Sequence, residues 1–192
     1  MLSAALCLSL VALLPISELK WVSGSFAAIG WTFEITRRIW PQWNDRLIWV
    51  FSAVAHPRER FVINSTTWYV TALLALSLTE DPILCTVGVA VLGAGDPIAA
   101  VVGRRWGRVR LLYSRTLEGS LAFVAMGTVA AWGLLAVLVP EVPLLTGLRL
   151  AALGSVAGAA AELASGRVDD NLSIPLAAAA AAWLSVNLEL WI

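Results

Sequence analysis

Long apolar stretches separated by short polar segments make up most of the chain. A helix that crosses a membrane needs about 20 mostly apolar residues to span a hydrocarbon core of about 30 Å. Five segments meet or approach that length, namely 61–78, 83–102, 119–139, 144–161 and 172–192, and two shorter apolar runs, 2–16 and 21–35, precede them. The pattern therefore predicts an all-α fold, a polytopic transmembrane helix bundle of about seven spans.

A different apolar pattern lies between the second and third predicted spans. Apolar residues recur there at spacings of three and four, opposite polar residues, at Trp43, Leu47, Val50, Phe51 and Val54. A single apolar stripe on an otherwise polar helix favours a position along the membrane surface. We expect a short interfacial helix in this part of the chain.

The chain is predicted to form one integral membrane domain over residues 1–192. No loop is long enough to hold a second core, and no internal repeat is evident. The first apolar run lacks a basic leading region and a clear small-residue cleavage site. These features favour a retained helix over a signal peptide.

The composition agrees with a membrane protein and excludes several classes of site. Hydrophobic residues make up 59%, charged residues 14%, and the mean hydropathy is +0.82, whereas soluble domains are about 45–50% apolar and about 25% charged. The formal net charge is zero, so we expect no nucleic-acid partner. The single histidine, His56, excludes a Ser-His-Asp triad and a multi-histidine metal cluster.

The positions of the basic residues orient the predicted bundle. If the N-terminus lies inside, the segments 37–60, 103–117 and 166–171 share one face and contain eleven of the 13 basic residues. Cytoplasmic loops are enriched in Lys and Arg. We therefore expect this face, and the polar residues near it, to be cytoplasmic.

One charged residue, Asp96, interrupts the predicted span 83–102. It lies seven residues before Gly103, or about 10 Å along a helix. A carboxylate at that depth is unfavourable unless it is paired, hydrated or metal-bound, which makes it a functional candidate. Gly93 and Ala100 share its helical face and line a small-residue groove. The alternative is an aspartate that pairs with a neighbouring arginine and pins two helices.

An arginine-rich loop follows this span directly. It contains two glycines, Gly103 and Gly107, and five arginines: Arg104, Arg105, Arg108, Arg110 and Arg115. The planar guanidinium group matches phosphate oxygens, so the loop is a candidate polyphosphate site. The alternative is a topology determinant that faces anionic lipid headgroups.

Acidic residues are predicted on the same face as the arginines. Glu118 and Ser120 open the helix after the loop, where backbone N–H groups favour anions, although such residues also cap helices. Glu162 continues the small-residue face of Gly154 and Gly158 at i, i+4 spacing. Asp170 and Asn171 follow in a tight turn, and they could equally cap the last helix.

Carboxylate and amide oxygens beside an arginine loop suit a magnesium–nucleotide complex. The usual soluble nucleotide motifs are missing: Lys20 is the only lysine, so no G-x-x-x-x-G-K-[ST] sequence is present.

Three motifs together resemble those of the CTP-dependent lipid kinases, the family of dolichol kinase, phytol kinase and the fungal-type diacylglycerol kinase. They are Gly95-Asp96-Pro97 through Gly107, Arg115-Thr116-Leu117-Glu118-Gly119-Ser120, and Glu162 with Asp169-Asp170-Asn171-Leu172-Ser173-Ile174-Pro175. The order and spacing match over about residues 37–188. The ending looks most like the phytol and polyprenol kinase branches.

The resemblance implies an enzyme that transfers the γ-phosphoryl group of CTP to a membrane lipid alcohol, with Mg²⁺ as cofactor. It implies that Asp96, Glu118 and Glu162 are catalytic and that Asp96, Glu162 and Asp170 hold the metal. The implied nucleotide-binding residues are Gly103, Arg104, Arg105, Gly107, Arg115, Ser120 and Asn171.

Two departures from the family pattern change this picture. Arg115 replaces a lysine, which keeps the charge but changes the geometry. Family members generally begin with an extra segment bearing an E-x-x-R-K-x-x-H pattern, for which Glu18-Leu19-Lys20-Trp21 is a poor substitute, so we expect this motif to be missing.

Two other functions stay open on the sequence alone. A phosphatidate cytidylyltransferase would use the same nucleotide, but its longer lysine-bearing segment is not found. A non-enzymatic transporter or scaffold predicts that Asp96 and Glu162 form structural ion pairs.

Overall fold

The computed structural model describes residues 2–40, 63–165 and 168–189, and this part of the chain is helical. Its α-helices are α1 (Leu2–Leu13), α2 (Ile16–Ile39), α4 (Ser65–Ser77), α5 (Pro82–Trp106), α6 (Leu117–Leu138), α7 (Leu144–Ala164) and α8 (Asp170–Glu189), with the short 3₁₀ helix η2 (Leu112–Ser114) between α5 and α6. An isolated bridge pairs Arg110 with Thr116. The all-α prediction is confirmed, whereas the expected interfacial helix lies outside the described residues.

Four helices, α5 to α8, are long and apolar enough to cross a membrane. The described parts of α1 and α4 have 12 and 13 residues, which at about 1.5 Å per residue is shorter than a hydrocarbon core. Helix α2 has 24 residues but carries charges near both ends. The helices follow the order of the predicted spans, but a count of about seven spans is not confirmed.

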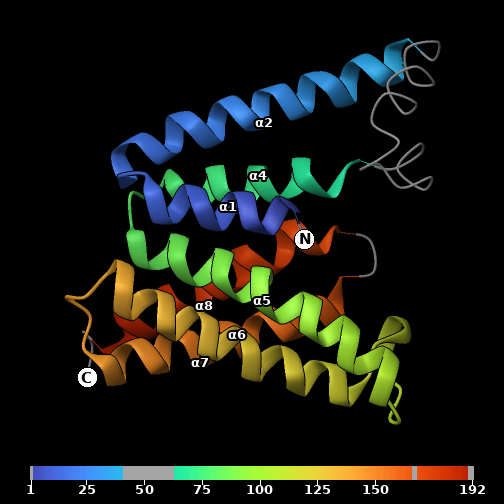
Figure 1. Cartoon of the computed structure of the whole chain (residues 1–192), viewed down its shortest axis with the longest axis vertical. Coiled ribbons are helices and arrows are strands. Elements are labelled where there is room, and N and C mark those ends of the chain that lie inside the picture. The colour runs from blue at the N-terminus through green and yellow to red at the C-terminus, as the bar shows by residue number, and fades with distance from the viewer. Residues whose placement is uncertain (1, 41–62, 166–167, 190–192) are drawn as a thin grey trace.

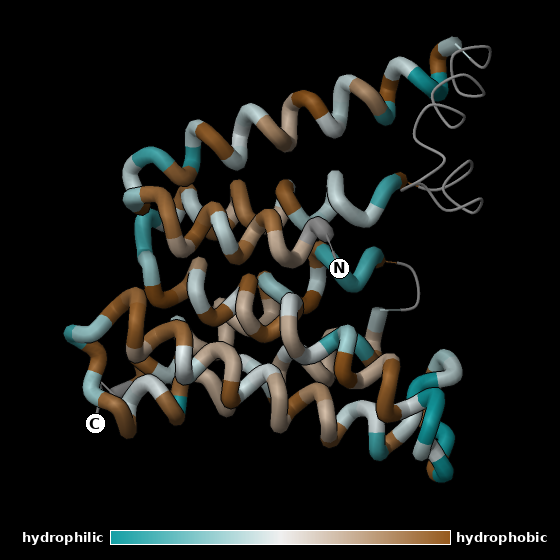
Figure 2. The backbone as a smooth tube through the Cα atoms, in the orientation of Figure 1, coloured by the Kyte–Doolittle hydropathy of each residue, from teal (hydrophilic) through white to brown (hydrophobic). Residues whose placement is uncertain are grey.

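Helix α5 lies at the centre of the bundle and contacts α1, α4, α6, α7 and α8 (Figure 1). Helix α2 lies on the outside, against α4 and α1. The ends of α2, α5 and α7 and the starts of α4, α6 and α8 lie at one end of the bundle, on the right of Figure 1. We call this the arginine-rich end, because the hydrophilic connection between α5 and α6 lies there (Figure 2).

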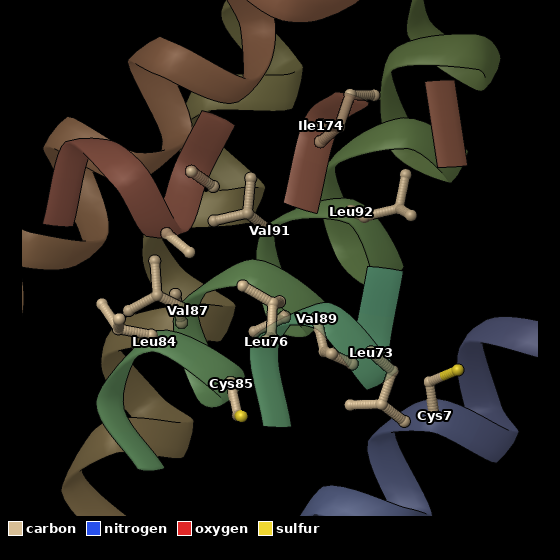
Figure 3. Packing of buried hydrophobic residues seen from close by; sticks show 14 of the residues in the cluster. Cys7, Leu73, Leu76, Leu84, Cys85, Val87, Val89, Val91, Leu92 and Ile174 are labelled. Carbon is tan, nitrogen blue, oxygen red and sulfur yellow. The ribbon is translucent and has the colours of Figure 1, made fainter. Parts of the chain in front are cut away.

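Glycines allow the helices to approach closely around the buried core (Figure 3). A Cβ atom added at Gly95 of α5 would lie 3.0 Å from the Phe123 ring of α6, and one at Gly158 would lie 2.9 Å from Val91. Gly154, Gly158 and Glu162 are all buried on α7. The predicted small-residue face therefore does point into the bundle and directs Glu162 inward.

Candidate active site at the arginine-rich end

The connection between α5 and α6 folds into a small hairpin that fixes the position of Arg115. The Leu111 N–H donates to the Arg115 carbonyl at 2.8 Å. At the turn, Tyr113 and Ser114 have positive φ angles of 51° and 66°, a conformation uncommon for residues other than glycine. This turn reverses the chain so that Arg115 faces α7 and α8.

Arg115 joins three separate parts of the chain through two ion pairs. Its Nη1 lies 2.9 Å from Oε1 of Glu162 on α7, and its Nη2 donates to Oδ2 of Asp170 at the start of α8. The Glu162 side chain is only 3% exposed, and such a buried carboxylate needs a partner. We call these three residues the Arg115 cluster.

A cavity of about 370 Å³ opens beside the Arg115 cluster, between α5, α6 and the hairpin. We call it the arginine cavity. Arg110 and Ser114 contribute to its wall, and six of the sequence-predicted residues line it: Gly103, Arg104, Gly107, Arg115, Ser120 and Glu162. Three arginines at one cavity create a positive site for an anionic ligand.

Two buried oxygen atoms at this place have no hydrogen-bond partner in the described part of the chain. They are Oγ of Ser120, which lines the arginine cavity, and Oδ1 of Asp170. Buried polar atoms are normally paired, so an unpaired one calls for an explanation such as a bound ion or ligand. The two atoms could interact with groups that bind between α6 and α8.

Asp96 lies one helical turn deeper than Ala100, which lines the arginine cavity. It makes no direct hydrogen bond or ion pair within the described residues, but it lies close enough to Arg115, Glu162 and Asp170 for their charges to interact. The arginine that acts on Asp96 is therefore Arg115, at a distance rather than in a direct ion pair. Glu162, by contrast, does form an ion pair.

Three predicted residues have other contacts and do not line the cavity. The Glu118 carboxylate accepts a hydrogen bond from the Val109 N–H at 3.2 Å and holds the hairpin to α6. The Arg105 guanidinium lies 5.1 Å from the Trp106 ring centroid. Asn171 donates its side-chain amide to Oδ1 of Asp169 at 2.7 Å, within the cap of α8.

Helix α5 extends to Trp106, so Gly103, Arg104 and Arg105 lie in its last turns and not in the predicted loop. Gly103 and the C-cap residue Gly107 pack against Thr116. A Cβ atom at Gly103 would lie 2.9 Å from Thr116 Oγ1, and one at Gly107 would lie 2.6 Å from Thr116 Cγ2. The same Oγ1 accepts a hydrogen bond from the Gly119 N–H and caps α6. These glycines therefore hold the hairpin close to α6, while their backbone lines the cavity.

The donor atoms at the site suit magnesium. The described residues contain no preformed group of three or more His, Cys, Asp or Glu side chains that could hold a metal ion. Magnesium, however, typically uses one or two carboxylates together with substrate phosphates and water. Asp96 and the unpaired Oδ1 of Asp170 are hard oxygen donors of the required type.

A second buried charged cluster, on α2, was missed by the sequence analysis. Glu34 is 0% exposed, accepts from Arg37 Nη2 at 2.7 Å, and accepts from the Asn64 N–H at 3.0 Å. The sequence signal was present: Glu34-Ile35-Thr36-Arg37-Arg38 fits the first five positions of E-x-x-R-K-x-x-H, with arginine for lysine. The expectation that no match exists was wrong, although proline stands at the histidine position.

The chain is similar to three curated proteins. It is 24% identical over 161 residues to CTP-dependent diacylglycerol kinase 1 of Saccharomyces cerevisiae, covering 74% of this chain and 56% of that protein. It is 36% identical over 114 residues to phytol kinase of Synechocystis sp., covering 57% and 47%. It is 31% identical over 137 residues to probable phytol kinase 1, chloroplastic, of Glycine max, covering 66% and 45%.

The chain thus spans about half the length of the curated relatives it matches. No protein-family model matches it, and no solved structure does.

Proposed function

We propose that the chain transfers the γ-phosphoryl group of CTP to the hydroxyl of a membrane lipid alcohol. Its similarity to these three kinases supports a place in the CTP-dependent lipid kinase family. The observation that carries the proposal is the Arg115 cluster at the wall of the arginine cavity. The site combines guanidinium groups, which can bind phosphate, with carboxylates, which can bind a metal ion and accept a proton.

The reaction requires positioning and charge neutralisation more than a strong nucleophile. The lipid hydroxyl oxygen forms a bond to the γ-phosphorus. The bond from this phosphorus to the bridging oxygen breaks, and CDP leaves with the electron pair. The hydroxyl proton passes to a carboxylate oxygen without a hydrogen-bond partner in the described residues, for which Asp96 and Oδ1 of Asp170 are the candidates.

The cavity residues divide between phosphate and metal. Arg104 and Arg115 face the phosphates, and Ser120 supplies a hydroxyl at the same wall. Asp96 and Asp170, with Glu162 beside them, would hold magnesium, which would supply further neutralisation of phosphate charge. Glu118 supports the hairpin and Asn171 the start of α8, while Arg105 lies against the ring of Trp106.

We place this site on the cytoplasmic face. The proposal rests on the excess of Lys and Arg in the sequence segments 37–60, 103–117 and 166–171.

The test is phosphoryl transfer by the purified chain in lipid nanodiscs. CTP labelled at the γ-phosphate, magnesium, and a panel of phytol, geranylgeraniol, dolichol and diacylglycerol are the substrates. We expect label in one or more lipids, with release of CDP. Release of pyrophosphate would instead indicate a cytidylyltransferase, and an absence of any turnover with all alcohols would contradict the proposal.

A further inference from the structure

A second cavity, of about 610 Å³, lies between α7 and α8 next to the Arg115 cluster. Helix α7 contributes Ala161, Ala164 and Ser165 to its walls, and α8 contributes Ser173 and Ala177. We call it the α7–α8 groove. Ala164 is exposed on the outer face of α7, and both helices are candidate membrane spans. The groove therefore opens on the outer surface of the bundle.

The α7–α8 groove and the arginine cavity adjoin each other. Tyr113 and Ala161 line the groove, and the residue that follows each of them, Ser114 and Glu162, lines the arginine cavity. The Arg115 cluster therefore lies where the two cavities meet.

The polar end of the groove offers a hydrogen-bond acceptor. The Ser165 hydroxyl donates to the Ala161 carbonyl at 2.6 Å and lies 2.6 Å from the Ser173 hydroxyl. A hydroxyl has only one proton to donate. Ser165 uses its proton on the Ala161 carbonyl or on the nearby Asp170 carboxylate, so Ser173 is the donor to Ser165, and lone pairs of Ser173 Oγ stay available to accept.

Asp170 provides a second acceptor beside Ser173. The two residues are three positions apart on α8 and so share a helical face. Oδ2 of Asp170 pairs with Arg115, while its buried Oδ1 has no partner within hydrogen-bond distance in the described residues, although the Ser165 hydroxyl lies near the carboxylate. The polar end of the groove thus has acceptors for one O–H group, and its remaining walls are mainly alanine.

We propose that the α7–α8 groove is the acceptor site, into which a lipid alcohol enters sideways from the bilayer. Its hydroxyl donates to Ser173 or Asp170, and its hydrocarbon chain leaves along Ala164 and Ala177. This inference rests on the proposed function and adds where the acceptor binds and which residues orient its hydroxyl. Ser173 is a positioning residue for the alcohol and has no contact with the nucleotide.

Photolabelling of the full chain in nanodiscs tests the groove without any need for turnover. A long-chain alcohol with a diazirine near its hydroxyl is activated by light in the absence of CTP. We expect label on peptides containing residues 161–165 and 173–177, and competition by unlabelled phytol. Labelling confined to other helices would overturn the inference.

Kinetics separates this inference from the proposed function. Ala177→Phe fills the groove and should raise KM for the alcohol by at least about tenfold, with KM for CTP unchanged. The control is Ala125→Phe at an exposed alanine of α6, which should leave both constants unchanged. If the wild type transfers phosphate and Ala177→Phe keeps the wild-type KM for the alcohol, the acceptor does not bind in the groove, and the proposed kinase activity is unaffected. If the wild type transfers no phosphate, the proposed kinase activity is contradicted, and photolabelling still tests whether the alcohol binds in the groove.

Ser173 variants test the positioning role. Ser173→Ala should lower kcat/KM for the alcohol about fivefold, the value of one neutral hydrogen bond. Ser173→Thr keeps the hydroxyl and should restore most of it. An equal loss in both variants would overturn the assignment of Ser173.

Discussion

Arg115 Nη1 lies 2.9 Å from Glu162 Oε1, although 46 residues and the whole of α6 separate them in the chain. The contact ties the hairpin after α5 to the inward face of α7. It places a guanidinium at the wall of the arginine cavity and leaves it 31% exposed. An arginine fixed in this way loses little conformational freedom when it binds phosphate.

Arg115→Met should lower both stability and activity. The change leaves two carboxylates without their cation, and we expect the free energy of unfolding to fall by about 2 kcal/mol. Adding Glu162→Gln to Arg115→Met removes one unpaired charge and should recover part of the stability without recovering phosphoryl transfer. SDS titration of the purified variants measures the first quantity, and labelled CTP measures the second. Full recovery of transfer in the double variant would show that Arg115 is only structural.

Asp96→Asn should abolish transfer while the fold is kept. The Asp96 carboxylate has no hydrogen bond or ion pair in the described residues, so its loss breaks no contact there, and we expect activity to drop by about 100-fold or more. The matched control is Glu141→Gln, an exposed carboxylate at the opposite end of the bundle, which should keep wild-type activity. Circular dichroism checks the helix content. A fully active Asp96→Asn would remove Asp96 from the site.

Gly107→Ala should disturb the hairpin. The added Cβ would lie 2.2 Å from the Gly103 carbonyl oxygen, so backbone must shift, at a cost of about 2 kcal/mol. Gly133→Ala is the control, because nothing lies within 4 Å of its added Cβ, and it should stabilise α6 by about 0.5–1 kcal/mol. Thermal unfolding in detergent compares the two. We also expect Gly107→Ala to weaken CTP binding, and unchanged binding would argue against a role for this backbone at the nucleotide.

Glu34→Gln should destabilise the contact between α2 and the start of α4. Arg37 is 5% exposed and pairs with Glu34, and removal of one partner from a buried ion pair costs about 3 kcal/mol. Glu18→Gln, at an exposed position on the same helix, should change stability by no more than about 0.5 kcal/mol. SDS titration of both variants makes the comparison. Equal losses in the free energy of unfolding would mean that the ion pair of Glu34 and Arg37 stabilises the fold no more than an exposed carboxylate does.

The pair of Lys20 and Glu80 should contribute to stability only above acidic pH. The hydrogen bond and the charge of Lys20 lower the pKa of Glu80 in the folded chain. Its stabilisation is therefore complete above the unfolded pKa, about 4.3, and is lost as pH falls through the lower folded pKa. Wild type should have a higher Tm than Glu80→Gln at pH 7, and the two should converge near pH 3. A Tm difference between wild type and Glu80→Gln that does not vary with pH would refute the stabilisation by this ion pair.

The helices and the end of the bundle at which the site lies were predictable from local features. Apolar run lengths set the helices α5 to α8, and the i, i+4 spacing of Gly158 and Glu162 directed Glu162 inward. The span count is not confirmed, because the described parts of α1 and α4 are apolar but have only 12 and 13 residues. Of the predicted site residues, Asn171 has its observed contact in the α8 cap, a role that the sequence analysis had left open as an alternative. Glu118 contacts the hairpin through the Val109 N–H, which the sequence analysis did not predict.

The sequence by itself determined which segments are helical and which polar residues gather at one end. Both features follow from neighbouring residues along the chain, namely the length of each apolar run and the positions of the arginines between the runs. Tertiary structure alone decided that Arg115, among the five arginines from Arg104 to Arg115, pairs with Glu162 and Asp170. It also decided that Asp96 has no direct ion pair within the described residues and that the α7–α8 groove adjoins the cavity. These relationships depend on how each helix is rotated and packed against its neighbours, and that is set by contacts between residues far apart in sequence.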